Sequence, residues 1–212
     1  MPILAALFIL LFAGNADADW LVAAFTGQSH TNSNTLTIAG PATQLTLGPV
    51  DYRGEGFKSP IYYGYRVGWA PGARGFGVEG EWVHAKARGT TNSILLTTFD
   101  QSHGLNFVLL GATYRQPLTG GRVALVARGG GGFTTPHVEG TFLGTHTESY
   151  QYGGLAWHGG GGLEIQIARG LTALADVRVT STAETLDVAG LTVDGTFVTS
   201  HLSFGVGWRF GR

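Results

Sequence analysis

The sequence predicts an all-β fold: an eight-stranded antiparallel up-and-down transmembrane β-barrel with three short periplasmic turns and four longer extracellular loops. Three observations lead to this fold class. Apolar and polar residues alternate with a period of two along most of the chain. Eight stretches carry this pattern, an even number as closed antiparallel barrels of the bacterial type require. The connections between them alternate between short and long.

Composition narrows the class of protein further. Only 13% of the 212 residues are charged, about half the share of about 25% that is usual in soluble domains. The chain has 35 glycines and no cysteine, which excludes disulfides, zinc thiolates and thiol catalysis. Its formal net charge is −1, so there is no electrostatic argument for nucleic acid as a partner.

The amino-terminal segment, residues 1–18, is expected to be a cleaved secretory signal. An apolar core over residues 3–13 precedes the small-residue pattern Ala16-Asp17-Ala18, which predicts cleavage before Asp19. A membrane anchor is the alternative, but the apolar stretch is shorter than the ~20 residues that a spanning helix needs. Residues 19–212 are then expected to form a single barrel domain.

The predicted strands follow from the alternation. In the last strand, large apolar residues from Val198 to Phe210 share one face, while His201, Ser203 and Arg209 share the other. The same two-faced pattern runs through "IYYGYRVGW" and "WHGGGGLEIQI". The predicted strands, in chain order, cover residues 19–28, 57–70, 76–88, 105–117, 122–134, 155–168, 172–182 and 196–210.

The connections are sorted by length. Short turns are expected at 71–75, 118–122 and 168–171. Long polar connections rich in Thr, Ser, Asn, Gly and His are expected at 29–56, 89–104, 135–154 and 183–195. In an up-and-down meander, this order places all short turns at one end of the barrel and all long connections at the other.

The polar face of these strands is predicted to point into the barrel. A soluble barrel would reverse the faces, and would then have to pack Trp69, Trp82, Trp157, Trp208 and Phe210 into a narrow interior. Turning the charged face inward gives a polar core and an apolar belt with aromatic girdles. The predicted polar network of the lumen, a structural site, consists of Arg66, Glu79, Glu81, Arg128, Glu164, Asp176 and Arg178, with Arg209 on the same face.

Turn lengths predict which of these charges meet. The turn at 71–75 should set Glu79 or Glu81 opposite Arg66. A three-residue turn after Ala168 would set Glu164 across from Asp176, with Arg178 diagonal to both. A barrel of eight strands has an interior just wide enough for side chains, so we expect a plugged lumen.

Two runs of four glycines, in "RGGGGF" (128–133) and "HGGGGL" (158–163), have two readings. A phosphate-binding loop would need a helix after the glycines, whereas another alternating strand follows Gly162. The favoured interpretation is that the runs lie on neighbouring strands with their glycines roughly opposite one another, where they permit strong curvature and save interior space.

With the signal ending Ala16-Asp17-Ala18, the stretch "YYGYRVGWAPGARGFGVEGEW" (62–82) and the terminal strand "FVTSHLSFGVGWRF" (197–210), the chain resembles small outer-membrane β-barrel proteins of Gram-negative bacteria. It is similar to the transmembrane domain of outer membrane protein A. The resemblance implies location in the bacterial outer membrane, contact with its lipid and lipopolysaccharide, and recognition of a terminal aromatic, here Phe210, by the barrel assembly machinery. We expect no cofactor.

A catalytic alternative comes from the last strand. Phe197, His201 and Ser203 have an F-x-x-x-H-x-S spacing that resembles the outer-membrane lipid A deacylases, in which a His activates a Ser. Phe204 stands where that family has Asn, no acid follows, and both polar residues are on the lumen face. We therefore expect no catalytic residues and no enzyme.

The histidines of the long connections are His30, His103, His137 and His146. They could bind a metal if the connections converge, but none has a ligand spacing such as H-x-x-x-H, and polar loop residues are the favoured reading. The leading function is a structural or interaction protein that presents its loops outside the cell. Its alternatives are an adhesion or ligand-binding barrel, a lipid-modifying enzyme and a narrow channel. The sequence names no extracellular partner.

Overall fold

The structure, a computed structural model, describes residues 18–41, 43–91, 93–118 and 120–211. The predicted signal up to Asp17 lies outside the described residues. No described segment forms a helix that is long and apolar enough to cross a membrane. The strands are β1 (Asp19–Thr31), β2 (Asn34–Gly40), β3 (Thr43–Arg53), β4 (Tyr63–Ala70), β5 (Gly75–Thr90), β6 (Leu96–Pro117), β7 (Val123–Thr134), β8 (His137–Phe142), β9 (Thr145–Tyr150), β10 (Gly154–Gln166), β11 (Leu171–Val188) and β12 (Leu191–Phe210).

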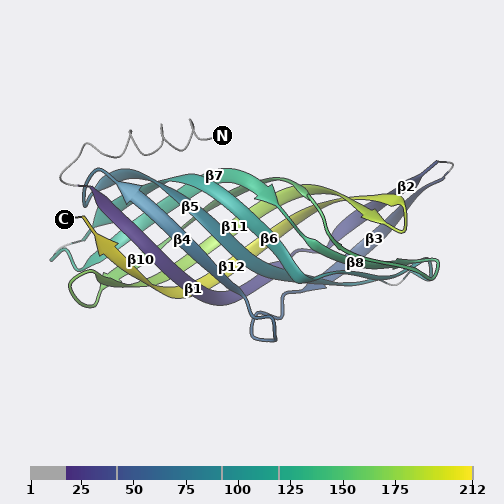
Figure 1. Ribbon diagram of the computed structural model, residues 1–212, viewed down its shortest axis with the longest axis horizontal. Helices are drawn as coiled ribbons and strands as arrows, with labels where there is room; N and C mark the ends of the chain where they lie inside the picture. Colours follow the sequence, from purple (N-terminus) through teal and green to yellow (C-terminus); the bar gives the residue numbers. More distant parts are fainter. Residues whose placement is uncertain (1–17, 42, 92, 119, 212) are drawn as a thin grey trace.

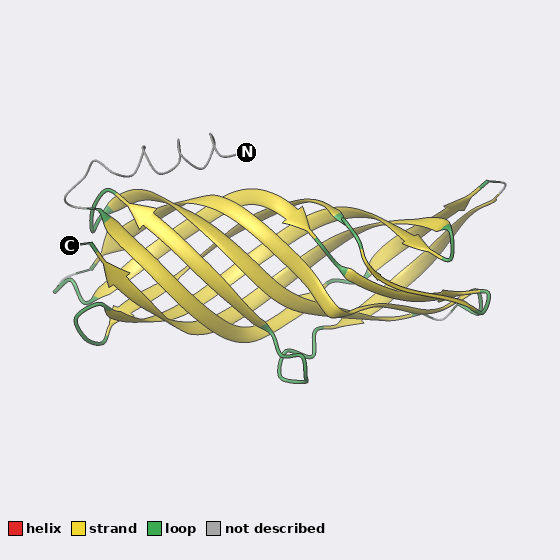
Figure 2. Ribbon diagram, viewed as in Figure 1, coloured by secondary structure: helices red, strands yellow, loops and turns green. Residues whose placement is uncertain are grey.

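Eight of these strands close into a ring, which confirms the predicted antiparallel up-and-down barrel (Figures 1 and 2). Going round the ring, the order is β1, β4, β5, β6, β7, β10, β11 and β12. β12 then pairs with β1, from Trp20 opposite Phe210 to Thr31 opposite Thr199. Closure leaves no free strand edge in this part of the sheet.

The ring strands correspond to the eight predicted ones, with one shortened start. β4 begins at Tyr63, so residues 57–62 of the predicted strand 57–70 are not strand. Pro60 in this segment has no backbone N–H to donate to a sheet. The short turns lie where the sequence places them, between β4 and β5, β6 and β7, and β10 and β11.

The four long connections differ from the expectation because most of their residues are strand. β2 and β3 form a hairpin that pairs with β12 on one side and β5 on the other. β8 and β9 form a second hairpin, in which β8 pairs with β6. β5, β6, β11 and β12 also run on beyond the ring. We call the strands past the ring the outer extension; Figure 1 shows it at the end opposite the carboxyl terminus.

Two-residue turns close two tips of the extension, between β8 and β9 and between β11 and β12. Leu143 and Gly144, and likewise Ala189 and Gly190, both have positive φ. Positive φ at both central residues defines the type I′ turn, whose twist matches that of the flanking strands. The turns set Phe142 opposite Thr145 and Val188 opposite Leu191. The extension is therefore an ordered continuation of the barrel wall.

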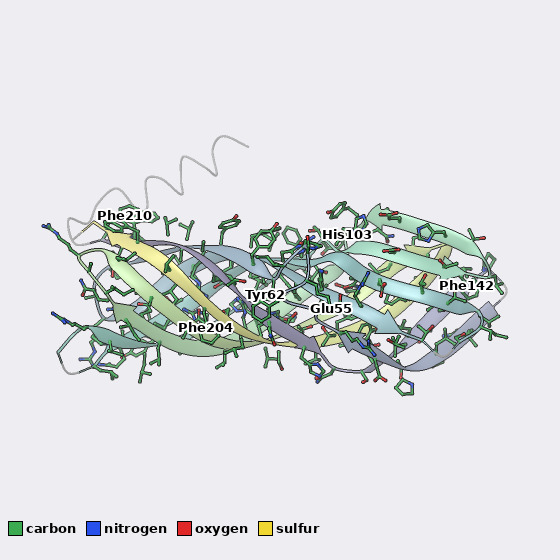
Figure 3. All side chains as sticks on the ribbon, turned by 90° about the horizontal axis from the view of Figure 1, so that it is seen from below. Glu55, Tyr62, His103, Phe142, Phe204 and Phe210 are labelled. Carbon is green, nitrogen blue, oxygen red and sulfur yellow. The ribbon has the colours of Figure 1, made fainter. Side chains whose placement is uncertain are left out.

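The inner and outer faces of the sheet exchange polarity between the ring and the outer extension. Around the ring, large apolar side chains face outward; examples are Val67, Phe76, Leu110, Val177 and Phe204. In the extension, the apolar side chains face inward and are buried. This inner cluster includes Leu36, Ile38, Val50, Leu96, Phe99, Val138, Leu186, Val193 and Phe197. In Figure 3, Phe204 marks the ring, and Phe210 and Phe142 lie near the two ends of the molecule.

The glycine runs lie on neighbouring strands, β7 and β10, as expected, but they are offset. Only Gly129 and Gly159 are directly opposite one another, and the bare patch continues onto β6, where Gly111 faces Gly130. Large neighbours cover it on the inside: a Cβ on Gly111 would lie 2.9 Å from the His158 ring. The glycines thus make room for lumen side chains.

Candidate functional site

The central feature of the ring interior is a cluster of three arginines and three acids. Alternation along the strands points their side chains into the lumen, where all six are buried. They come from four strands that surround the lumen: Arg66 from β4, Glu79 and Glu81 from β5, Arg128 from β7, and Asp176 and Arg178 from β11. With equal numbers of each sign, the cluster is electrically neutral. We call it the central cluster.

Every acid of the central cluster contacts two arginines. Register sets Glu81 directly opposite Arg66, one of the two pairings that the turn at 71–75 predicts. Glu81 also bonds Arg178. On the far side, Asp176 bonds Arg128 and receives a hydrogen bond from the Arg66 guanidinium at 3.0 Å.

Glu79 completes the central cluster. It accepts a hydrogen bond from Arg128 Nε at 2.9 Å and lies 3.8 Å from Arg66 Nε. Charge-assisted bonds of this kind are about twice as strong as neutral ones. The network therefore connects strands that are not neighbours in the sheet.

Aromatic side chains border the central cluster toward the extension. The guanidinium carbons of Arg66 and Arg178 lie 5.4 Å and 5.9 Å from the centre of the Phe25 ring, within cation–π range. The Tyr62 hydroxyl accepts a hydrogen bond from Arg178 at 3.4 Å. Past Tyr62, the interior becomes the apolar cluster of the extension.

A second neutral group, the turn-end cluster, fills the lumen near the short turns. Glu164 receives hydrogen bonds from Arg115 Nε at 2.7 Å and from Arg209, whose guanidinium also bonds Asp19 at 2.8 Å. Arg115 and Asp19 are not among the lumen residues that the sequence predicts. Arg115 is on the inner face of β6, where both faces are largely apolar, so alternation gives little signal there. A cavity of about 30 Å³ adjoins the cluster, room for one or two waters.

The expected pairing of Glu164 with Asp176 is wrong. The turn residues are 168–170, so the turn begins one residue earlier than expected, and Gly170 takes the positive φ that a three-residue turn needs. This moves the register by two residues. Glu164 faces Leu174, Gly162 faces Asp176, and Gly160 faces Arg178. A shift of two keeps every side chain on the same face.

His201 and Ser203, the pair considered for catalysis, are buried on the lumen face. The two ring nitrogens of His201 contact other groups: Nδ1 lies 3.2 Å from the Tyr62 hydroxyl, and Nε2 lies 2.9 Å from the Thr180 hydroxyl. The ring thus serves as a polar bridge between β12, β11 and the segment before β4. The charged group near His201 is the guanidinium of Arg178, which donates a hydrogen bond to the same Tyr62 hydroxyl.

Glu184 is a buried acid in the outer extension, beyond the apolar belt. Its carboxylate accepts hydrogen bonds from Thr134 at 2.7 Å and Gln101 at 2.6 Å. Burial raises the pKa of Glu184 from its usual 4.5 to about 7, against the smaller effect of these two bonds. The sequence analysis does not predict Glu184 as a buried residue, because residues 183–195 are expected there to be a connection, whereas β11 continues to Val188.

The structure brings three of the four histidines of the long connections close to one carboxylate, Glu148, and leaves His30 apart from them. His30 is exposed on β1. His103, His137 and Glu148 bring potential metal-ligand atoms within 4.8 Å of one another, and His146 lies beside Glu148 on β9. In the part of the chain that the structure describes, this is the group with the donor set for a metal ion.

The fold and the lumen together define a small antiparallel barrel of eight strands with a polar, ion-paired interior. No protein-family profile matches the chain, and no curated protein matches it in sequence. Among solved structures, it is similar to the outer membrane protein OprG from Pseudomonas aeruginosa, with a TM-score of 0.50, 13% identity, and coverage of 93% of this chain and 98% of that one.

Two further barrels match with lower TM-scores. Neisserial surface protein A has a TM-score of 0.46 and 10% identity, covering 91% of this chain and 99% of that one. Ail, the attachment invasion locus protein of Yersinia pestis, has a TM-score of 0.41 and 16% identity, covering 92% and 99%. At these identities, the OprG match shows a shared fold.

Replacing Arg66 with Ala should destabilise the protein by about 3–5 kcal/mol, because it leaves buried acids without their cation. Adding Glu81→Gln should recover part of the loss, since the central cluster then holds two charges of each sign. Unfolding by urea from lipid vesicles measures both. Arg88→Ala, at a half-exposed pair with Glu55, is the control and should cost less than about 1 kcal/mol. Strictly additive losses in the double variant would contradict a coupled network.

Glu184 should make stability depend on pH. Because its pKa is raised in the folded state, its contribution is most favourable below about pH 4.5 and is lost as the pH rises through about 7. The shift corresponds to roughly 3 kcal/mol. Glu184→Gln should remove this part of the pH dependence, measured as the difference in unfolding free energy from wild type between pH 5 and 9. Asp187→Asn, at an exposed position on the same strand, is the matched control. Parallel pH profiles for wild type and Glu184→Gln would contradict the assignment.

Proposed function

We propose that this chain is an integral outer-membrane protein of a Gram-negative bacterium that holds a plugged barrel in the lipid and presents the outer extension outside the cell. Its role is structural or interactive, without catalysis. The observation that carries the proposal is the exchange of polarity: the ring is apolar outside and ion-paired inside, whereas the extension is apolar inside.

The ring exterior suits a bilayer. Along β12, the outward residues Leu202, Phe204, Val206, Trp208 and Phe210 are all about half exposed, which would be unfavourable for a strand in water. An apolar band flanked by aromatic side chains is the exterior that lipid requires. The barrel shared with OprG, an outer membrane protein, supports the same location. Outer-membrane lipid and lipopolysaccharide would then surround the ring. Phe210, the last residue of β12, is the aromatic residue that the barrel assembly machinery would recognise.

The lumen argues for a plug and against an open channel. Two neutral ion-paired clusters follow one another along the lumen, the turn-end cluster and the central cluster. Phe25 and Tyr62 border the central cluster. Moving a charge out of such a network would leave its partner buried and unpaired, at a cost of several kcal/mol. The network therefore resists the rearrangement that a continuous water path needs.

The geometry of the last strand favours a structural role over catalysis. A Ser–His hydrolase needs the imidazole free to take the hydroxyl proton. His201 instead contacts Tyr62 and Thr180 through its two nitrogens, inside the lumen. An acyl chain in the bilayer would approach from the other side of the wall.

The extension is the surface that partners would meet. The β8–β9 hairpin carries outward Thr, Ser, Glu and His residues on a rigid sheet, and such residues on a fixed scaffold suit recognition. Adhesion or ligand binding would use this surface; its chemistry does not select one partner class.

Single cysteines would test the topology, because the chain has none of its own. Thr145→Cys lies at the exposed start of β9, and Gly72→Cys lies in a short turn with open space around its Cβ. A membrane-impermeant maleimide should label Thr145→Cys on intact cells, and Gly72→Cys only after the outer membrane is permeabilised. Labelling in the reverse order would refute the proposed orientation, and labelling of neither in outer-membrane fractions would refute the location.

Conductance separates a plug from a channel. Purified wild-type protein in planar bilayers should show no steady open-pore current, because ion pairs occupy the lumen. Bilayers that receive detergent alone set the baseline. A large, stable conductance from wild type would overturn the plugged lumen and favour the narrow-channel alternative.

A further inference from the structure

We propose that His103, His137 and Glu148 bind a divalent transition-metal ion on the outside of the wall, with His146 as a neighbouring fourth group. The site goes beyond the proposed function, since its chemistry is independent of where the protein resides. The three side chains come from β6, β8 and β9, and His103 lies near the middle of the long axis (Figure 3).

The distances suit a small cation with little rearrangement. The potential ligand atoms of the three residues lie within 4.8 Å of one another, and His137 Nε2 is 3.7 Å from Glu148 Oε1. Ligands about 2.0–2.1 Å from a tetrahedral zinc ion are about 3.3 Å apart. The remaining contraction falls on the side chains of His103 and Glu148, which are exposed.

A bulge in β6 brings His103 to this place. The register with β5 passes from Ala85 opposite Leu105 to Ala87 opposite Gln101, so β6 carries two extra residues there. Gly104, at a φ of 124°, provides the backbone conformation that the irregularity needs. The His103 ring then meets the His137 ring edge to face, with centroids 5.0 Å apart.

A further observation points to a cation. Among the described residues, His137 has no hydrogen bond at either ring nitrogen: Nδ1 is buried without a partner, and Nε2 is beyond bonding distance of Glu148. In the register of the hairpin, Glu139 on β8 lies directly opposite Glu148 on β9, which places a second acid beside the site.

The environment of Glu148 completes the site. Its second oxygen, Oε2, lies 3.8 Å from His146 Nε2. The Thr141 hydroxyl contacts the other nitrogen of that ring at 3.2 Å and so holds the imidazole toward the carboxylate. Imidazole nitrogens with one carboxylate suit zinc and its neighbours, whereas calcium and magnesium take oxygen ligands only.

Binding would fasten the second hairpin to the barrel wall. β8 pairs with β6, while β9 pairs with β8. An ion held by His103 and Glu148 would connect β6 to β9 across β8. The site thus links the far strand of the hairpin to a strand of the ring.

Zinc titration tests the site. Protein refolded in detergent is treated with EDTA, dialysed and titrated with ZnCl₂ by calorimetry, which should give one ion per chain. His137→Ala should abolish binding, and His103→Ala and Glu148→Gln should each weaken it at least about tenfold. Cobalt in place of zinc should give the visible absorption of tetrahedral coordination, and calcium should give no heat.

His30→Ala is the matched control, because it removes an exposed histidine on β1 and should leave zinc binding unchanged. His103 and Glu148 are themselves exposed, so their variants should fold, as heat-dependent electrophoretic mobility would verify. Absence of saturable zinc binding to wild type, or unchanged affinity in the His137→Ala/Glu148→Gln double variant, would overturn the proposal. Either result would leave the location and the plug of the proposed function to their own tests.

Discussion

Charge balance inside the ring is the constraint on which the rest of the structure depends. An interior that eight strands enclose must be filled by side chains, and here five arginines meet five acids in two neutral clusters. Four of the acids each contact two arginines, so ion pairs join strands that are not hydrogen-bonded neighbours. Successive side chains of a strand point to opposite faces of the sheet. Because the inward positions carry the ion pairs, the residues between them point outward, and these apolar residues form the belt on the exterior.

The same strands pass through two environments. β5, β11 and β12 carry the ring's polar-in pattern and then, past Tyr62, the extension's apolar-in pattern, while the inner face of β6 is largely apolar in both parts. An apolar interior stabilises the extension by the ordinary hydrophobic effect. The ring's polar interior gains little from that effect and depends on matched ion pairs. Glu184 lies in the apolar part, and its described partners are the neutral side chains of Thr134 and Gln101, so burial dominates its pKa.

Sequence reasoning found the ring because alternation and turn length are local signals. The charged residues that alternation turns inward, from Arg66 to Arg178, are buried in the structure. A period of two assigns a residue to a face even when the register is off by two. The extension was missed because its tips use Leu143-Gly144 and Ala189-Gly190, where Asn-Gly or Asp-Gly is the recognisable signal. His103 and Glu148 meet only through the pairing of β6 with β8 and a bulge, which no spacing in the chain reveals.

The strand-built extension has a consequence for recognition. A flexible loop must give up conformational entropy when it binds, but a hairpin closed by a type I′ turn has already lost that freedom on folding. Contacts made by its outward side chains therefore convert more fully into affinity. Shape and chemistry also become separable: outward residues such as Thr145 or Glu148 can be exchanged one at a time while the backbone outline stays fixed. Two barrels could share this outline and recognise entirely different surfaces.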